Sequence, residues 1–147
     1  MTEAIRLRVE EILAECHNYF EGDFSRHFGG FEVVNGEIQP VESFLVPGQW
    51  FRVVGSKFND GVYQYPTFTM VDERFDGSVW ALAVPPAVVA CAEETVNWEK
   101  REAHEASSMI SESFGGYTYT KATNSKGQPV GWRDVYADRL KRWRKMP

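Results

Sequence analysis

The sequence predicts an α+β fold, in which a small helical bundle carries an inserted antiparallel β-sheet or partial barrel. Three observations favour this class. Apolar residues recur at helical spacing near the start of the chain and again after Pro85-Pro86. Between these stretches, over about residues 29–84, short β-prone runs alternate with turn dipeptides. The 147 residues fit one domain, which we divide into a body over 1–120 and a basic C-terminal loop and helix over 121–147.

Two amphipathic helices are predicted in the body. The first runs over about residues 3–20, and Thr2 can cap its exposed amides. Its apolar face consists of Ile5, Val9, Ile12, Leu13, Cys16 and Phe20. The second opens at Pro85-Pro86 and extends to about residue 106, with an apolar stripe of Val88, Val89, Ala92 and Val96. Because the two stripes match, we expect these helices to pack together.

The inserted section is predicted to be mostly antiparallel strand. Asn35-Gly36 is the strongest hairpin signal, because these residues readily adopt the positive φ angles of a type I′ turn. Further turns are expected at Asn59-Asp60-Gly61 and at Asp76-Gly77. The strands expected around these turns cover residues 31–34, 37–39, 50–54, 62–65, 68–71 and 79–84. Short strands with frequent turns are typical of a small twisted sheet or partial barrel.

Charge is unevenly placed along the chain. The whole chain has a formal net charge of −5, but residues 121–147 hold eight basic residues against two acidic ones. The C-terminal segment therefore carries +6 and the rest of the chain −11. Such asymmetry predicts that a basic tail contacts an acidic partner protein or nucleic acid.

The tail combines this charge with aromatic residues, after a polar loop over residues 123–131. A helix is predicted over Trp132–Trp143, and aromatic and arginine side chains are the usual anchors of protein interfaces. We expect the tail to be loosely packed in the isolated protein and to become ordered on a partner. The candidate partner-binding residues are Trp132, Arg133, Tyr136, Arg139, Leu140 and Trp143. The alternative is that this aromatic stripe packs on the first helix or on the helix after Pro85.

A second candidate contact precedes the tail, in the segment 111–120. If this segment is extended, Tyr117 and Tyr119 share one face, and an edge strand of this kind can pair with a neighbouring chain. We therefore predict a subunit contact through these two tyrosines. The alternative is an ordinary strand that covers the core.

The sequence gives no catalytic or metal-binding pattern, and we predict no catalytic residue, no metal and no cofactor. The histidines at 17, 27 and 104 have no carboxylate or cysteine at a known ligand spacing, and the paired glycines fit no phosphate-binding loop. Asp72, Glu73 and Asp76 are interpreted as a solvated turn. An enzyme would need Asp72, Glu73 and His104 to converge by folding.

Other features bear on where the protein works. Cys16 and Cys91 both lie in helical patterns and are interpreted as buried thiols of a reducing compartment. No apolar run is long enough to cross a membrane, and the N-terminus lacks the basic and apolar pattern of a signal peptide. These observations predict a cytoplasmic protein that does not bind a membrane.

Three segments resemble the head–tail connector (adaptor) proteins of tailed phages and prophages of Gram-positive bacteria. They are residues 53–63 (VVGSKFNDGVY), the junction at residues 81–87 with its helix, and residues 111–120 (SESFGGYTYT). Together they span most of residues 48–120, and their order along the chain is similar to that in the family. The basic Trp/Arg-rich end adds to the likeness.

The resemblance implies a structural subunit rather than an enzyme. Such a subunit assembles into a ring with neighbouring copies, docks on the portal protein through its C-terminal segment and joins the head to the tail. Its further partners are tail-side connector proteins and the DNA that passes through the channel without sequence-specific binding. It would reside in the cytoplasm of the bacterial host and then in the virion. The alternative from the residues alone is a small protein-binding module with an SH3-like β-barrel.

Overall fold

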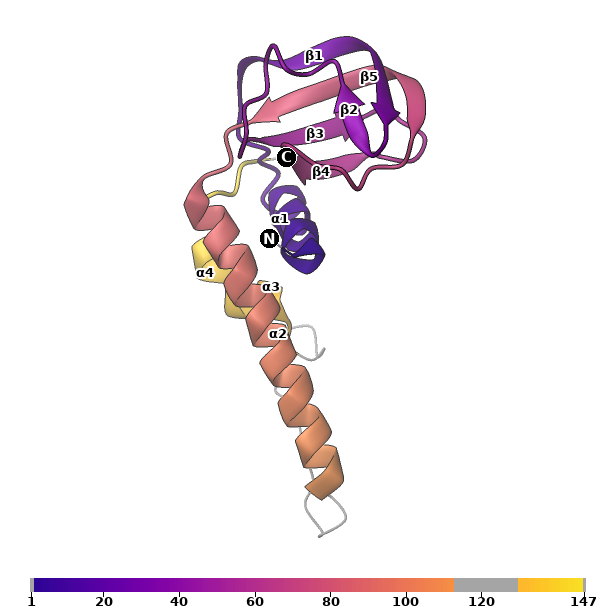
Figure 1. Ribbon diagram of the computed structural model, residues 1–147. Helices are drawn as coiled ribbons and strands as arrows, with labels where there is room; N and C mark the ends of the chain where they lie inside the picture. The colour runs from indigo at the N-terminus through magenta and orange to yellow at the C-terminus, as the bar shows by residue number, and fades with distance from the viewer. Residues whose placement is uncertain (1, 113–129, 147) are drawn as a thin grey trace.

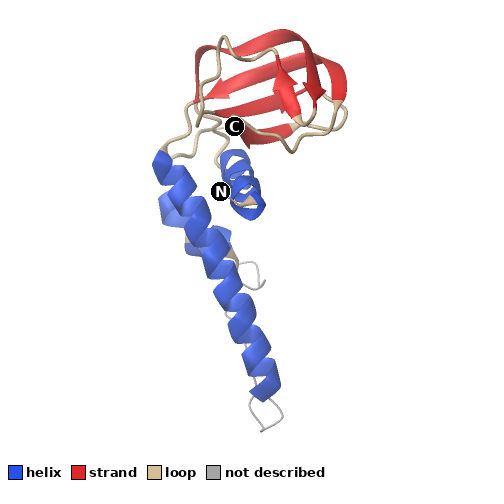
Figure 2. Ribbon diagram, viewed as in Figure 1, coloured by secondary structure: helices blue, strands red, loops and turns tan. Residues whose placement is uncertain are grey.

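The protein has an α+β fold, with a curled antiparallel sheet at one end and helices at the other (Figures 1 and 2). The structure is a computed structural model that describes residues 2–112 and 130–146, with side chains described for 2–105 and 130–146. The described elements are α1 (Glu3–Glu15), β1 (Glu21–Val34), β2 (Glu37–Gln39), β3 (Trp50–Val54), β4 (Gly61–Gln64), β5 (Glu73–Leu82), α2 (Pro86–Glu112), α3 (Trp132–Val135) and α4 (Ala137–Leu140). The predicted fold class is confirmed at this level.

The five strands form one sheet in the order β2-β1-β5-β3-β4, and every neighbouring pair is antiparallel. The sheet curls into a half-barrel, as Figure 1 shows. Successive side chains of a strand point to opposite faces, so each strand contributes to two environments. One face lines the inside of the half-barrel and the other faces the helices.

The inner face is filled by aromatic and β-branched side chains. Phe51 from β3 is fully buried and its ring lies 5.6 Å from that of Tyr63 in β4. The loop before β3 closes this core with Val41 and Leu45, both nearly or fully buried. Adjacent residues of β3 and β5, such as Trp50 with Phe51 and Val79 with Trp80, are buried together because each face of the sheet packs against its own core.

The outer face of the sheet meets the helices. The predicted contact between the first two helices is confirmed, because their stripes share one core with the sheet residues Trp50, Val62 and Leu82. The buried members of the two stripes are Val9, Ile12, Leu13, Cys16, Val88, Ala92 and Val96. Thr2 caps α1 as expected, since its hydroxyl accepts a hydrogen bond from the amide of Ile5.

The hairpin at Asn35-Gly36 is also confirmed. It joins β1 to β2, and both residues have positive φ angles of 55° and 82°. Gly36 has a second reason to be glycine, because a Cβ atom there would overlap the backbone carbonyl of Phe68. The turn is thereby held against the loop before β5, whose Asp72 accepts a hydrogen bond from the Gly36 amide.

The turn predicted at Asp76-Gly77 is wrong, because β5 runs through both residues. Gly77 lies opposite Gly29 in the neighbouring strand β1. A Cβ atom at Gly77 would overlap the carbonyl of Val54 in β3, so this glycine permits a close approach of strands.

Several boundaries also differ from the prediction. The sheet begins at residue 21 rather than 29, and the segment 68–71 is a loop rather than a strand. The first helix ends at Glu15 rather than near residue 20, and α2 continues to Glu112 rather than ending near residue 106. The helix predicted over residues 132–143 is divided into α3 and α4.

Candidate functional site

The tail packs into the body rather than standing apart from it. Trp132 is 4% exposed and Leu140 is fully buried, and both belong to the core between the helices and the sheet. The expectation of a loosely packed tail is therefore wrong for residues 130–146, which are the part of the tail that the structure describes. The alternative interpretation, in which the aromatic stripe packs on the first two helices, is correct for Trp132 and Leu140. These two side chains are not available to a partner in this conformation.

Polar contacts fix the tail against the end of α1. The backbone amide of Lys145 donates to the Cys16 carbonyl at 2.8 Å, and Asn18 Nδ2 donates to the Trp143 carbonyl at the same distance. The Cys16 thiol lies 3.6 Å from the Leu140 carbonyl. Cys16 and Cys91 are free and buried, as predicted, and burial raises the pKa of both thiols.

Most of the tail's described arginines pair with carboxylates of the same chain. Arg133 lies 3.4 Å from Glu11 and 3.2 Å from Glu15, both on α1. Arg144 lies 3.4 Å from Glu15, and Arg139 pairs with Glu94 of α2. The acidic partner that the charge asymmetry predicted is thus, for these three arginines, the helical layer of the chain itself.

Arg8 of α1 joins three elements at the base of the tail. Its side chain is 8% exposed, and its Nη2 atom lies 2.8 Å from Glu99 of α2. Its guanidinium carbon lies 4.4 Å from the centre of the Trp132 ring, and that of Arg133 lies at the same distance. The ring of Trp132 is therefore covered by guanidinium groups as well as packed in the core.

Some of the predicted contact residues do reach the surface. Tyr136 and Trp143 are half-buried against the core, while the side chains of Arg133 and Arg139 are 51% and 39% exposed. Tyr117 and Tyr119, the predicted subunit contact, lie outside the described residues. The tail thus presents charged groups outward and keeps its largest apolar groups inside.

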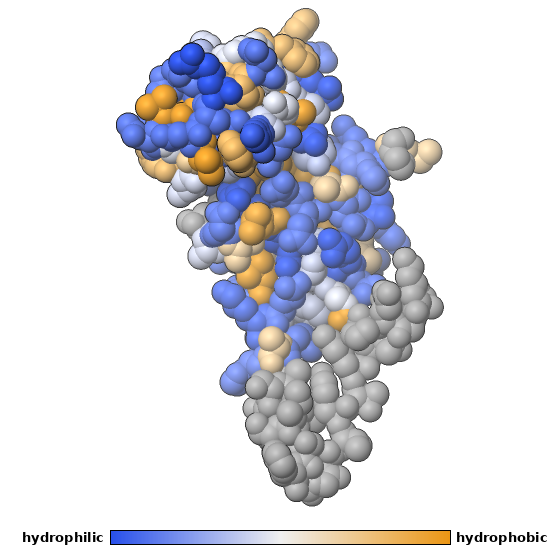
Figure 3. Space-filling view, turned by 90° about the vertical axis from the view of Figure 1, so that its right-hand side faces the viewer, coloured by the Kyte–Doolittle hydropathy of each residue, from blue (hydrophilic) through white to orange (hydrophobic). Residues whose placement is uncertain are grey.

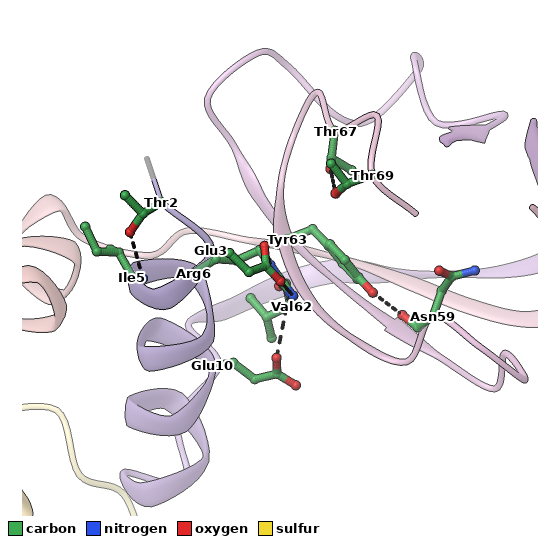
Figure 4. Close-up of polar contacts among 10 residues, drawn as sticks. All are labelled: Thr2, Glu3, Ile5, Arg6, Glu10, Asn59, Val62, Tyr63, Thr67 and Thr69. Carbon is green, nitrogen blue, oxygen red and sulfur yellow. Dashed lines mark hydrogen bonds and ion pairs between the residues drawn. The ribbon is translucent and has the colours of Figure 1, made fainter. Parts of the chain in front are cut away.

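The first helix also covers the edge of the sheet at β4 (Figure 4). Arg6 donates to the Val62 carbonyl at 2.6 Å, and Glu10 accepts a hydrogen bond from the Val62 amide. Both exposed backbone groups of this edge residue are therefore satisfied by side chains, which blocks pairing with another strand. Burial raises the pKa of the Glu10 carboxyl, although Arg6 and Arg52 act in the opposite direction.

A groove runs between α1 and α2. Its walls come from Ala4, Leu7, Arg8, Glu11, Val96, Glu99, Lys100 and Ala103, and its volume is 440 Å³. Leu7 is 43% exposed there although it lies on a helix with a well-packed opposite face. Figure 3 shows apolar side chains interrupting the hydrophilic surface along this helical part. The groove thus combines apolar side chains such as Leu7 and Val96 with charged ones such as Glu11 and Lys100.

The residues considered for catalysis do not come together. Asp72 and Glu73 stabilise turns and loops of the sheet. Asp72 accepts a hydrogen bond from the Gly36 amide, and Glu73 accepts hydrogen bonds from the amides of residues 57 and 58. His104 lies in the half of α2 that points away from the sheet (Figure 1). His27 stacks on Phe44 with ring centres 3.7 Å apart. Among the described residues, no three histidines, cysteines or carboxylates are grouped so that they could hold a metal ion.

Sequence reasoning missed one chemical grouping, the row Arg26–Trp80–Arg52 across three strands. The arginines are far apart in the sequence, and only the strand register brings them together. A single arginine within the apolar run of residues 50–54 is the local signal that was available.

Comparisons with protein-family models, with curated proteins and with solved structures found no match to this chain. Within the described residues, none of the helices is both long and apolar enough to span a membrane.

Proposed function

We propose that the chain is a structural head–tail connector subunit of a tailed phage or prophage, which assembles into a ring on the portal and joins the head to the tail. The likeness of residues 48–120 to that family supports the proposal, as does the basic, aromatic C-terminal segment. In this role the protein is made in the cytoplasm of the bacterial host and ends in the virion. Its partners would be its own copies, the portal protein and tail-side connectors, and the passing DNA would be bound without sequence specificity.

The observation that carries the proposal is the open groove between α1 and α2. α2 has 27 residues and α1 has 13, so the longer helix extends about 40 Å, roughly twice the length of its neighbour. Among the residues of α2 whose side chains are described, Val96 is the last that is buried. The groove continues past it to Ala103. Helices in water gain most of their stability from packing of an apolar face. A second copy of the chain is the occupant we propose for this groove.

The outer side of the tail is the surface we propose for the portal. Arg133 and Arg139 are partly exposed there, and Lys141 is 74% exposed. Because Trp132 and Leu140 are internal, this contact would depend on charge more than on apolar anchors. Binding should therefore weaken as salt is raised, since screening acts on exposed charges.

The proposal is tested by measuring assembly mass. Native mass spectrometry of the purified chain, alone and with purified portal protein, should show a closed ring or its addition to the portal. The variant Leu7→Glu places a charge in the groove and should reduce the assembly to monomers. Val46→Glu is the matched control, because Val46 is 62% exposed on a loop of the sheet end, and it should assemble normally.

A binding module with an SH3-like β-barrel is the second candidate function. The observation in its favour is an open cavity on the curled sheet, whose lining includes Phe31, Phe75 and Pro40. This function predicts a monomer that stays monomeric with portal protein present. A monomer at every concentration, unchanged by Leu7→Glu, would contradict the connector proposal and favour this alternative.

A further inference from the structure

Three residues of the helix-facing side of the sheet form a row through strand register. Trp80 in the central strand β5 lies directly opposite Arg26 of β1 on one side and Arg52 of β3 on the other. Residues directly opposite one another in neighbouring strands share a face, and their side chains are in contact range. The row therefore places two guanidinium groups around one indole ring.

The rings hold the two guanidinium groups in place. The Arg26 and Arg52 guanidinium carbons lie 3.8 and 4.4 Å from the Trp80 ring centre. Tyr19, from the connection between α1 and β1, covers Arg52 as well, at 4.1 Å. Trp80 is itself fixed by a hydrogen bond from Nε1 to the Ser78 hydroxyl. Arg52 is consequently preorganised, which lowers the entropic cost of binding a ligand through it.

The two arginines differ in how their hydrogen-bond donors are used. Arg26 is paired with Glu21 through two hydrogen bonds of 2.9 and 3.1 Å. For Arg52, no carboxylate within ion-pair distance and no hydrogen-bond acceptor is found among the described residues. A guanidinium group is always charged and has five N–H donors. The guanidinium group of Arg52 is therefore fixed in position and charged, and its N–H donors have no acceptor among the described residues.

These side chains line a pocket of 380 Å³ between the sheet and the end of α1. Lys145, from the tail, adds a third positive charge to the lining, and Glu21 contributes the one negative charge. The lining thus carries +2, with histidine taken as neutral, in a chain whose formal net charge is −5. A positive concavity in an acidic protein attracts an anionic group locally. Its lining residues are His17, Asn18, Tyr19, Glu21, Arg26, Arg52, Trp80 and Lys145.

We infer that this pocket binds a side-chain carboxylate from an acidic segment of a partner protein. The planar fork of a guanidinium group matches a carboxylate, and such charge-assisted hydrogen bonds are strong. Nucleic acid fits less well, because the acidic chain repels a polyanion as a whole. In addition, guanidinium groups already lie over the rings of Trp80 and Tyr19, which leaves less ring surface for stacking on bases. The inference concerns a surface other than the α1–α2 groove and does not rest on ring assembly.

Calorimetric titration of the full chain with an acetylated hexaglutamate peptide at low salt tests the inference. The peptide should bind saturably, whereas the matched hexaglutamine peptide should not bind. Arg52→Met should weaken binding about tenfold or more, the loss expected when a charge-assisted hydrogen bond is removed. Arg74→Met is the matched control, because Arg74 is an 85% exposed arginine of β5 outside the pocket, and it should bind like the wild type.

Two further variants keep the test decisive if Arg52→Met does not fold. Arg52→Lys retains the charge but loses the planar fork, and it should weaken binding by a smaller factor. Lys145→Met removes an exposed charge of the lining and should weaken binding without loss of the folded state. Equal binding by the wild type, Arg52→Lys and Lys145→Met would overturn the inference.

Competing anions identify the ligand class. Inorganic phosphate should compete only weakly, and a single-stranded DNA oligonucleotide of equal charge should bind less tightly than hexaglutamate. Tighter binding of the oligonucleotide, lost in Arg52→Met, would overturn the assignment to an acidic protein segment. Absence of saturable peptide binding at millimolar concentration would overturn the site altogether.

Discussion

Arg133 and Arg139 of the tail and Arg52 of the sheet have opposite surroundings. In the tail, Arg133 and Arg139 reach carboxylates of α1 and α2, so their charges are balanced within the chain. In the sheet, Arg52 is held by two aromatic rings and has no carboxylate within ion-pair distance among the described residues. The tail is the segment that charge counting predicts as a binding surface, yet Arg52, which has no hydrogen-bond acceptor among the described residues, lies in the sheet. The density of charge in the sequence does not show which cations the fold already pairs with carboxylates of the same chain.

The largest expected effect concerns the apolar anchor of the tail. Trp132→Ala should lower the free energy of unfolding by about 3–5 kcal/mol, because a buried tryptophan leaves a large cavity. Trp143→Ala should cost clearly less, since Trp143 is only half-buried. Urea unfolding followed by circular dichroism measures both. Equal and small losses would mean that the tail is not part of the core.

A smaller effect is expected at the sheet row. Arg52→Met removes two guanidinium–ring contacts and should cost about 1–2 kcal/mol of stability, while it breaks no ion pair. The loss should persist at high salt, because contacts of this kind depend on ring stacking as well as charge. The same denaturation series in 0.05 and 1 M salt measures it. A loss that disappears at high salt would indicate a hidden carboxylate partner for Arg52.

The ion pairs of the tail should contribute less again. Arg139→Met removes the pair with Glu94, whose two side chains are 39% and 53% exposed, so we expect a loss of about 0.2–1 kcal/mol. High salt should abolish this difference, unlike the difference at Arg52. A larger loss that salt does not change would show that packing of the arginine stem, rather than its charge, stabilises the tail.

The smallest effect concerns pH and the capped edge of the sheet. Burial raises the pKa of Glu10 in the folded state, so folding favours its protonated form. The stability from this group is full below the unfolded pKa and is lost as pH rises through the folded pKa. Glu10→Gln keeps an oxygen for the Val62 amide and should remove the loss that sets in as pH rises above the ordinary carboxyl pKa of 4.5. Glu93→Gln, which removes a carboxylate from an exposed position on α2, is the matched control.

Local signals in the sequence predicted the parts of the fold that local physics determines. The apolar stripe that includes Val9 and Leu13 predicted the first helix and its packing against α2. Asn35-Gly36 predicted the hairpin. Asp76-Gly77 has the same local signal as a turn, but it lies in the central strand, where Gly77 permits the approach of β3. The local sequence does not distinguish a glycine that must adopt a positive φ angle from a glycine that must leave room for a neighbouring strand.

The same limit explains the functional residues. Trp132 and Arg133 look like interface anchors in the sequence, because their partners on α1 are more than a hundred residues away along the chain. The row of Arg26, Trp80 and Arg52 depends on the registers of two strand pairs. The sequence of one strand alone does not predict how it aligns with its neighbour. Which arginines are satisfied is a property of the tertiary structure alone.

Thermal unfolding of the chain that ends at residue 129, compared with the full chain, tests most directly whether the tail is internal. Truncation removes Trp132 and Leu140 from the shared core and the amide of Lys145 from the Cys16 carbonyl. We expect the truncated chain to be unfolded or to melt at a much lower temperature, because surfaces of α1 and α2 become exposed. A truncated chain that melts like the full chain would contradict it and would restore the tail as a free contact surface.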